Sequence, residues 1–307
     1  MTIACVTGGN GLVGRHIVSL LLEAGYQVRI LSRSVPAGAV AGVEYFQGAL
    51  ADTTSLRAFL DSAALIFHCA AELKSESLMW AVNVEGTQNL ADAFKVSGAK
   101  FFYFISSAGV VGLTRNKVVT EDEQCVPRNL YESSKLAAER VLLQSIPLSS
   151  LVILRPTNVI DNERPGVLQQ ALRSDIYSRL KFFLKGKESA HLVHANDVAR
   201  AALSFIGKDE SHYGRCYFIS CDRDPDNYML GVRRLVHYYA FGRNNLLMIS
   251  LPVFFPFLMR WLVSEKSNRG DVIYSSDRLS STGFSYAYTV QGMVKEFAEF
   301  YMKPDFR

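Results

Sequence analysis

A glycine-rich turn directly after the first apolar run constrains the fold of this 307-residue chain more than any other feature. Residues 2–7 form a short apolar run, and Gly8, Gly11 and Gly14 follow it ahead of an amphipathic stretch at residues 12–24. The first two glycines of such a strand–turn–helix unit let the backbone approach a pyrophosphate, and the third lets the helix pack on the strand. This order predicts the opening of a dinucleotide-binding unit.

The residues that follow continue the alternation of strands and helices. We expect helices at 55–60 and 75–97, a helix that carries Tyr131, and strands at 27–31, 43–47, 65–69, 101–105 and 151–154. The run at 101–105 is apolar throughout, which is typical of a strand buried on both faces of a parallel sheet. The pattern predicts an α/β protein with a Rossmann-like, doubly wound parallel sheet.

The alternation breaks after residue 158. Helices are expected there at 165–184, 196–206, 228–239 and 290–301, with a short strand at 216–219. We therefore predict a smaller C-terminal substrate-binding lobe that is interleaved with the sheet. The cofactor domain is assigned to residues 1–157 with returning segments at about 191–221, and the lobe to residues 158–190 and 222–307.

Composition narrows the function. Hydrophobic residues make up 49% of the chain and charged residues 20%, which is typical of a packed globular protein. The net charge of +4 is small and the basic residues are scattered, so nucleic-acid binding is not indicated. Five cysteines without CxxC spacing indicate a reducing compartment and no metal site. The first residues lack the pattern of a signal peptide, so we expect a cytoplasmic protein.

Residues 246–263 form an apolar stretch with two interpretations. Only 14 residues precede Arg260, and Pro252 and Pro256 interrupt them, whereas about 20 apolar residues are needed to span a bilayer. A transmembrane helix is therefore not expected. The favoured interpretation is a wall of the substrate lobe. The alternative is an interfacial patch that contacts lipid or a lipid-linked substrate.

Two residues after the second expected strand bear on the choice of cofactor. An NAD site usually has an acidic residue at this position to hold the ribose 2′-hydroxyl. Ser32 occupies it here, and Arg33 is suited to a 2′-phosphate. NADP is therefore favoured over NAD, which stays as the alternative.

Tyr131 and Lys135 are four residues apart on an expected helix, so their side chains share one face. A free tyrosine titrates near 10, so a base at neutral pH needs a shift of about three units, or roughly 4 kcal/mol. An ammonium about 5 Å away supplies roughly 3 kcal/mol at an effective dielectric of about 20. The pair makes physical sense as an acid–base device beside a redox cofactor.

These motifs together resemble the extended short-chain dehydrogenase/reductase family, most closely its nucleotide-sugar epimerase branch. The resemblance runs along nearly the whole chain and its motifs occur in the family's order. They are the glycine turn with Thr7, His68-Cys69-Ala70-Ala71, Asn83-x-x-Gly86-Thr87, Ser106-Ser107, Tyr131-x-x-x-Lys135, Arg155-Pro156-x-Asn158 and Val193-His194-x-x-Asp197.

The resemblance implies a role for each matching residue. Tyr131 would be the general acid/base, Lys135 would hold the nicotinamide ribose and lower the tyrosine pKa, and Ser107 would hydrogen-bond the reacting oxygen. Asn158 and Arg269 would contact the substrate, and structural roles are expected for His68, His194 and Asp197. The implied cofactor-binding residues are Thr7, Gly8, Asn10, Gly11, Leu12, Val13, Gly14, Ser32, Arg33, Ala49, Leu50, Cys69, Ala70, Ala71, Asn83, Ile105, Ser106, Tyr131, Lys135 and Pro156.

Departures from the family pattern bear on the reaction and the substrate. Ala108-Gly109 replace the Asp-Glu pair of the dehydratases, which argues against dehydration. Ala190 stands where the family has its first phosphate-clamping arginine, and Arg269 is the candidate for the other clamp. These departures argue against a standard nucleotide-diphosphate sugar as the substrate.

Three functions remain open. The leading hypothesis is hydride transfer at a sugar carbon, as a nucleotide-sugar or lipid-linked sugar 4-epimerase or 4-keto reductase in polysaccharide biosynthesis. The second is an NADP-dependent dehydrogenase or reductase of a hydrophobic, sterol- or flavonol-like substrate, and the third is a cofactor-sensing binding protein without catalysis. By analogy with the family, we also expect a homodimer formed through the helices that carry Asn83 and Tyr131.

Overall fold

The computed structural model describes residues 2–35, 38–242, 249–264 and 268–302. The chain forms two compact units. Unit 1 contains residues 1–112, 125–156 and 198–217, and unit 2 contains residues 113–124, 157–197 and 218–307.

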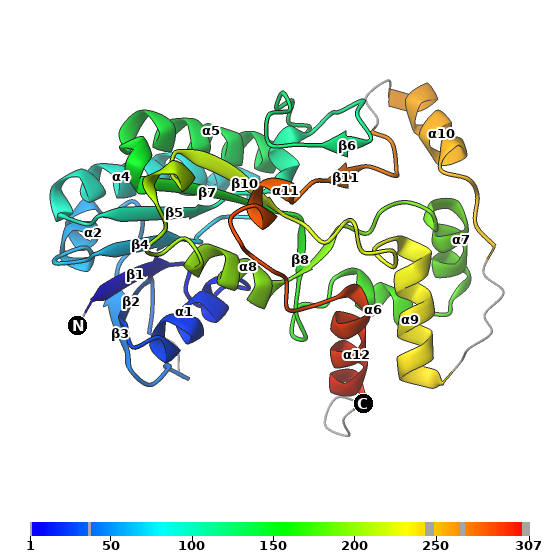
Figure 1. Cartoon of the computed structure of the whole chain (residues 1–307), viewed down its shortest axis with the longest axis horizontal. Helices are drawn as coiled ribbons and strands as arrows, with labels where there is room; N and C mark the ends of the chain where they lie inside the picture. The colour runs from blue at the N-terminus through cyan, green and yellow to red at the C-terminus, as the bar shows by residue number, and fades with distance from the viewer. Residues whose placement is uncertain (1, 36–37, 243–248, 265–267, 303–307) are drawn as a thin grey trace. The chain divides into compact units, whose positions relative to one another are not determined.

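Unit 1 is built on a seven-stranded sheet in the order β10-β7-β5-β4-β1-β2-β3 (Figure 1). β1 pairs with both β2 and β4, and these ladders are parallel, as are those of β2 with β3, β4 with β5 and β5 with β7. The chain therefore reverses its direction across the sheet between β1 and β4, where ligands bind in open α/β sheets. The strands are β1 (Ile3–Thr7), β2 (Gln27–Ser32), β3 (Val43–Gln47), β4 (Leu65–His68), β5 (Phe101–Ile105), β7 (Leu151–Pro156) and β10 (Arg215–Ile219).

Helices cover both faces of this sheet. α4 and α5 lie on one face and α1 on the other (Figure 1). The core under α2, α4 and α5 contains Phe59, Phe94, Phe102, Phe104 and Leu142, all buried. The helices are α1 (Gly14–Glu23), α2 (Thr53–Phe59), α3 (Glu76–Trp80), the π-helix η1 (Ala81–Glu85), α4 (Gly86–Ser97), α5 (Leu130–Ser145), α8 (Ala195–Leu203, which begins in unit 2) and the 3-10 turns η2 (Ala108–Val111), η3 (Leu148–Ser150) and η4 (Glu210–His212).

Unit 2 combines two short parallel strand pairs with a helical core. β6 (Val118–Val119) pairs with β11 (Ile273–Tyr274), and β8 (Asn158–Ile160) with β9 (Leu192–His194). Leu168, Phe182, Val232, Met293 and Phe297 meet in its core. The helices are α6 (Val167–Leu172), α7 (Ile176–Lys185), α9 (Met229–Phe241), α10 (Phe254–Ser264), α11 (Asp277–Ser280) and α12 (Val290–Tyr301).

The predicted Rossmann-like fold is confirmed, and several local expectations are revised. The helix expected over 165–184 is two helices, because the Asp175 side chain accepts hydrogen bonds from Ser178 N and Oγ and begins α7 there. The helix expected over 75–97 contains the π-helical turn η1. Residues 113–124, expected in the cofactor domain, belong to unit 2, where β6 pairs with β11.

The apolar stretch at 246–263 lies partly outside the described residues, which resume at 249. Its described part ends in α10. Within the described ranges, no helix is both long enough and apolar enough to cross a bilayer.

Candidate active site

The glycine turn between β1 and α1 is tight enough to require glycine at two positions. Gly8 has φ +67°, and a Cβ there would lie 2.6 Å from Ala70 N. A Cβ on Gly14 would lie 2.2 Å from the Gly8 carbonyl oxygen. The turn is closed by the hydrogen bond that Gly11 N donates to Gly8 O at 2.9 Å. Backbone N–H groups at the N-terminus of a helix bind phosphate groups, and the absence of side chains at these two glycines lets a pyrophosphate come close to the backbone.

A series of buried hydrogen bonds links Thr7, next to the glycine turn, through His68 to Thr87. His68 Nδ1 is 2.6 Å from Thr7 Oγ1, its Nε2 is 2.9 Å from Thr87 Oγ1, and Thr87 donates to the Asn83 carbonyl. Burial, with the nearby Lys135 charge, lowers the pKa of His68 to about 3. His68 is therefore neutral and structural, as expected. Cys69 N donates to Thr7 O, so the pairing of β1 with β4 continues by one hydrogen bond beyond His68. This brings Ala70 next to Gly8.

Ser32 is the last residue of β2 and Arg33 follows it. Because β1 and β2 are parallel, both residues lie at the same edge of the sheet as the glycine turn. The Ser32 hydroxyl donates to Ser34 O at 2.7 Å, and Arg33 is exposed. The Arg33 charge contributes to lowering the pKa of Glu72, whose carboxylate mainly accepts backbone N–H groups of residues 73–75. A cationic side chain thus stands in solvent where the 2′-substituent of a bound dinucleotide is expected.

The π-helical turn η1 places Asn83 between two parts of the site. The Asn83 carboxamide accepts from Glu72 N at 2.7 Å and donates to Glu72 O and to Ser134 Oγ, each at 3.0 Å. Ser134 lies on α5 between Tyr131 and Lys135. Asn83 therefore fixes the loop after β4 to the helix that carries the acid–base pair.

Ser107, Tyr131 and Lys135 come together at the carboxyl end of β5. The Ser107 hydroxyl accepts from Gly109 N at 3.1 Å and is also hydrogen-bonded to the Tyr131 phenol. Taken alone, this second bond acts to lower the pKa of the phenol. Tyr131 stands in the first turn of α5, which the Asn129 side chain caps by accepting Glu132 N. Lys135 is buried; its Nζ donates to Ile105 O at 2.7 Å and lies 4.1 Å from the centre of the Phe104 ring.

The pKa values of the pair differ from the expectation. Burial outweighs the Ser107 hydrogen bond and raises the pKa of Tyr131, and the Glu132 charge adds to the rise. Burial lowers the pKa of Lys135 to about 8. The predicted depression of the Tyr131 pKa by Lys135 is therefore not found in this structure, because the ammonium faces the Ile105 carbonyl and both groups are desolvated.

A buried ion pair that the sequence analysis missed stands one turn further along α5. Glu139 Oε1 accepts Ser106 Oγ at 2.5 Å and Arg155 Nε at 3.0 Å, and Oε2 accepts Arg155 Nη2 at 2.6 Å. The Glu139 charge raises the pKa of Lys135 and so opposes the effect of burial. The signal was present in the spacing, since Glu139 follows Lys135 by four residues on the same helix face.

The predicted backbone positions of the cofactor site also lie around this sheet edge. Ile105 ends β5 and its carbonyl accepts from Lys135. Ser106 follows β5 and its hydroxyl donates to Glu139, and Pro156 ends β7. Asn10, Leu12 and Val13 lie in the turn itself, Ala49 and Leu50 follow β3, and Ala71 follows Ala70 after β4.

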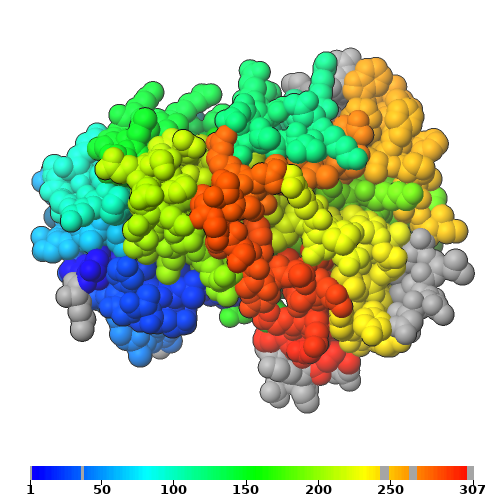
Figure 2. Space-filling model, viewed as in Figure 1, coloured from blue at the N-terminus to red at the C-terminus, as the bar shows by residue number. Residues whose placement is uncertain are grey.

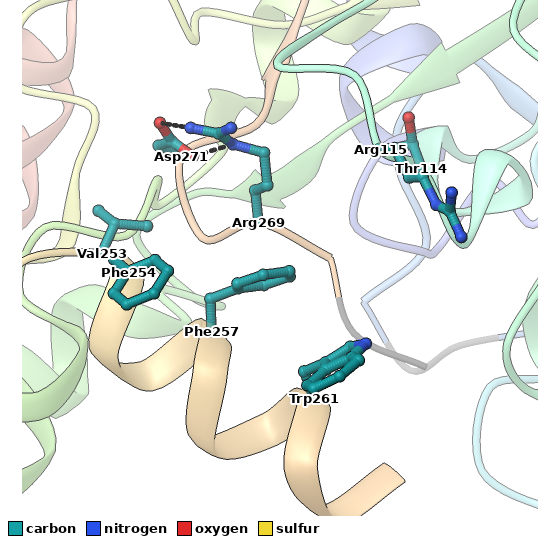
Figure 3. Close-up of a pocket in the computed structure, with 8 residues that line it drawn as sticks. All are labelled: Thr114, Arg115, Val253, Phe254, Phe257, Trp261, Arg269 and Asp271. Carbon is teal, nitrogen blue, oxygen red and sulfur yellow. Dashed lines mark hydrogen bonds and ion pairs between the residues drawn. The ribbon is translucent and has the colours of Figure 1, made fainter. Parts of the chain in front are cut away.

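The two predicted substrate residues of unit 2 are both engaged within it. Asn158 Nδ2 donates to Ala190 O at 2.8 Å. Arg269 binds both carboxylate oxygens of Asp271, at 2.9 and 3.1 Å, and this pairing lowers the pKa of Asp271 (Figure 3). Ala190 is buried in the core of unit 2, so no cation occupies the position of the expected first phosphate clamp.

Arg269 lines a pocket of about 480 Å³ within unit 2. One wall is aromatic and comes from α10, where Phe254, Phe257 and Trp261 recur at helical spacing and point to one side (Figure 3). Val253, Thr114, Arg115 and Asp271 complete the lining. The pocket therefore offers a large apolar surface with two guanidinium groups at its border.

His194 and Asp197 have structural roles in unit 2, as expected. The Asp197 carboxylate accepts Ala287 N at 2.8 Å and Tyr288 N at 3.0 Å, and the His194 ring stacks on Tyr288 with centroids 3.8 Å apart. No cluster of three or more potential metal ligands occurs in the part of the chain that the structure describes.

Comparisons with known proteins agree with this geometry. Residues 4–219 match the NAD dependent epimerase/dehydratase family. An uncharacterized protein of Sinorhizobium fredii is 30% identical over 209 residues, which cover 66% of this chain and 52% of that protein. A 3 beta-hydroxysteroid dehydrogenase/Delta 5-->4-isomerase of Mycobacterium tuberculosis is 30% identical over 252 residues, which cover 72% of this chain and 65% of that protein. The chain thus spans between half and two thirds of these relatives.

Among solved structures, UDP-glucose 4-epimerase of Thermotoga maritima superposes with a TM-score of 0.74 at 19% identity, covering 98% of both chains. That likeness concerns the fold alone. The match over residues 4–219 includes the glycine turn, Ser107, Tyr131 and Lys135. The chain belongs to the NAD-dependent epimerase/dehydratase family.

Proposed function

We propose that this chain is an NAD(P)-dependent oxidoreductase that transfers hydride at a secondary alcohol or ketone carbon of a substrate with a large apolar part. The observation that carries the substrate class is the pocket in unit 2, whose wall is formed by Val253, Phe254, Phe257 and Trp261. Its volume of about 480 Å³ is in the range of small-molecule sites, which are mostly apolar with a few placed polar groups.

Two further observations support an apolar substrate. The charge of Arg269 is already balanced by Asp271, and the buried Ala190 supplies no cation for a diphosphate. The Mycobacterium tuberculosis relative, a 3 beta-hydroxysteroid dehydrogenase/Delta 5-->4-isomerase, is similar over 72% of this chain.

The cofactor would be held by the glycine turn and by residues at the carboxyl ends of β1, β4 and β5. At Gly8, where Ala70 approaches closely, the turn exposes backbone and no side chain, which suits a pyrophosphate. The Lys135 ammonium lies at the end of β5, where it donates to Ile105 O. A nicotinamide bound there would accept or supply the hydride.

The chain's own residues would move the proton. Tyr131 would take the proton of the substrate hydroxyl during oxidation and return it during reduction, while the Ser107 hydroxyl, already bonded to the phenol, would orient the reacting oxygen. Lys135, which carries a positive charge below its pKa of about 8, would hold the nicotinamide ribose. Glu139 would keep Lys135 charged by raising that pKa.

A nucleotide sugar is the second candidate, as a 4-epimerase or 4-keto reductase. The observation in its favour is that Arg115 and Arg269 both line the pocket, because guanidinium groups are suited to bind diphosphate oxygens. The solved Thermotoga maritima structure, which contains UDP-glucose, has the same fold.

The test is a substrate panel followed by nicotinamide absorbance with NADP and with NAD. Hydroxysteroids and long-chain ketones represent the first candidate, UDP-glucose and UDP-galactose the second, and the Tyr131→Phe variant is the control. Turnover of apolar substrates alone supports the proposal. Turnover of UDP-sugars alone overturns it in favour of the second candidate, and cofactor binding without turnover of either favours a cofactor-sensing protein.

We propose in addition that the chain forms a homodimer through α4 and α5. Both helices expose apolar side chains, namely Val96 at 71% and Leu143 at 42% of their surfaces. Light scattering at micromolar concentration should give twice the chain mass of 34.2 kDa. A mass of one chain would refute this.

A further inference from the structure

Helix α7 presents an apolar face to solvent that the proposed reaction does not use. Ile176 is 85% exposed and Tyr177 75% exposed, while Ser178 and Phe182 on the other side are buried. At about 100° per residue, the exposed apolar side chains occupy one arc of about 120°. They are Ile176, Tyr177, Leu180, Phe183 and Leu184.

Cationic residues flank this arc on both sides. By helical geometry Arg179 lies about 40° beyond one edge and Lys181 about 40° beyond the other. Lys185 follows on the side of Lys181, Lys187 comes two residues after the end of α7, and residues 176–187 contain no acidic residue. An apolar stripe flanked by basic side chains is typical of a helix that lies in the plane of a membrane surface.

Helix α10 also exposes apolar side chains. Phe254 is 62% and Leu262 66% exposed, and Phe255, Met259 and Trp261 are exposed as well. The single charged residue of Phe254–Leu262, Arg260, pairs with Glu188 at 2.5 Å. Leu251 N donates to Phe183 O, which joins the segment before α10 to α7. Figure 2 shows α10, in orange, at the surface.

We propose that α7 and α10 form a membrane-docking face, made of the exposed apolar residues above together with Arg179, Lys181, Lys185 and Lys187, which binds an anionic lipid bilayer. The apolar side chains enter the headgroup region, Trp261 and Tyr177 lie at the level that aromatic residues favour, and the cations meet lipid phosphates. Phe254 and Trp261 also line the pocket assigned above to the substrate, so the docking face and that pocket share part of α10.

Charge favours lipid over a second copy of the chain as the occupant. A two-fold contact would bring the same four cations of both copies together, with no acidic residue in 176–187 to balance them. Anionic headgroups supply that balance, and each basic residue near such a surface strengthens binding about fivefold.

The test is flotation of the full chain with vesicles of phosphatidylcholine alone and of phosphatidylcholine mixed with phosphatidylglycerol. We expect flotation with the mixed vesicles, weak flotation with phosphatidylcholine, and loss of the difference at about 1 M salt, where the Debye length is about 3 Å. The double variant Phe255→Glu/Leu262→Glu should bind mixed vesicles about tenfold or more weakly. Lys181→Gln/Lys185→Gln should lose about fivefold per lysine on mixed vesicles only.

Leu148→Glu is the matched control, because Leu148 is 54% exposed but lies in unit 1. It should float like the unchanged protein, and retained dinucleotide binding would show that every variant is folded. Absence of flotation by the unchanged protein overturns the proposal, as does unaltered flotation of Phe255→Glu/Leu262→Glu. Equal binding to both vesicles at low salt overturns the role of the cations. An oligomer that dissociates in the glutamate variant, without vesicle binding, would assign the face to contacts between copies.

Discussion

Replacing Lys135 by Met should stabilise the fold while abolishing turnover. Lys135 is 2% exposed, and burial lowers its pKa from 10.5 to about 8. Between these two values the unfolded chain binds more protons than the folded one, so the stability of the unchanged protein rises with pH across that window. Below pH 8 both states are protonated, and the full cost of burying the ammonium is present.

The magnitude follows from the size of the pKa shift. A shift from 10.5 to about 8 corresponds to about 3 kcal/mol at pH 7, about 2 kcal/mol at pH 9 and less than about 0.5 kcal/mol at pH 10.5. Met keeps the apolar stem of the side chain and removes the charge. Lys135→Met should therefore be about 2–3 kcal/mol more stable than the unchanged protein at pH 7, after allowing for the lost bond to Ile105 O.

Urea unfolding of both proteins at pH 7, 8, 9 and about 10.5, without cofactor, measures the difference directly. The control is Lys100→Met, since Lys100 is an exposed lysine of unit 1. The stability gap of Lys135→Met should shrink as pH rises, and that of Lys100→Met should stay near zero. A gap that does not change with pH, or a variant that is less stable at pH 7, would refute the reasoning.

Three further predictions address the same site. Glu139→Gln removes the charge that pairs with buried Arg155 and should lower the free energy of unfolding by about 3–5 kcal/mol, or about 10 °C in Tm by calorimetry. Because the Glu139 charge raises the pKa of Lys135, its loss should also move the alkaline limb of the pH–rate profile to lower pH. An unchanged Tm contradicts the pairing. Tyr131→Phe should reduce turnover about 10²–10⁴-fold while the dinucleotide Kd, measured by fluorescence titration, stays within about twofold; near-normal turnover would exclude the phenol as acid/base. Arg33→Asp should weaken NADPH binding about tenfold or more without weakening NADH, and equal losses for both would argue against selection of the 2′-phosphate.

The sequence predicted the cofactor side of this molecule better than the substrate side. Strands β3 and β5 and helix α12 begin and end at the expected residues, because each is an apolar or amphipathic run between clear breaks. The glycine turn and Ser107 follow β1 and β5 at one edge of the sheet, since the parallel topology brings the strand ends to one side, and Ser107 is hydrogen-bonded to Tyr131.

What sequence reasoning could not predict depends on tertiary contacts. The two-residue strands β6 and β11 are 154 residues apart in the sequence at their closest and have no periodicity to detect before they pair. The pKa of Tyr131 depends on how deeply the phenol is buried, which spacing along a helix does not determine. The spacing places Glu139 on the helix face of Lys135, but its partner Arg155 comes from β7 and is brought to it only by the tertiary fold.

The path of the chain between the two units has a practical consequence. Backbone leaves one unit for the other five times, after residues 112, 124, 156, 197 and 217. A fragment that stops at residue 156 would lack β10, so β7 would become an unprotected edge strand open to pairing with other molecules. Each unit consists of three separate segments, so neither can be expressed as one contiguous piece. Residues 113–124 belong to unit 2 but connect two segments of unit 1, so proteolytic nicking or circular permutation there would perturb both units at once.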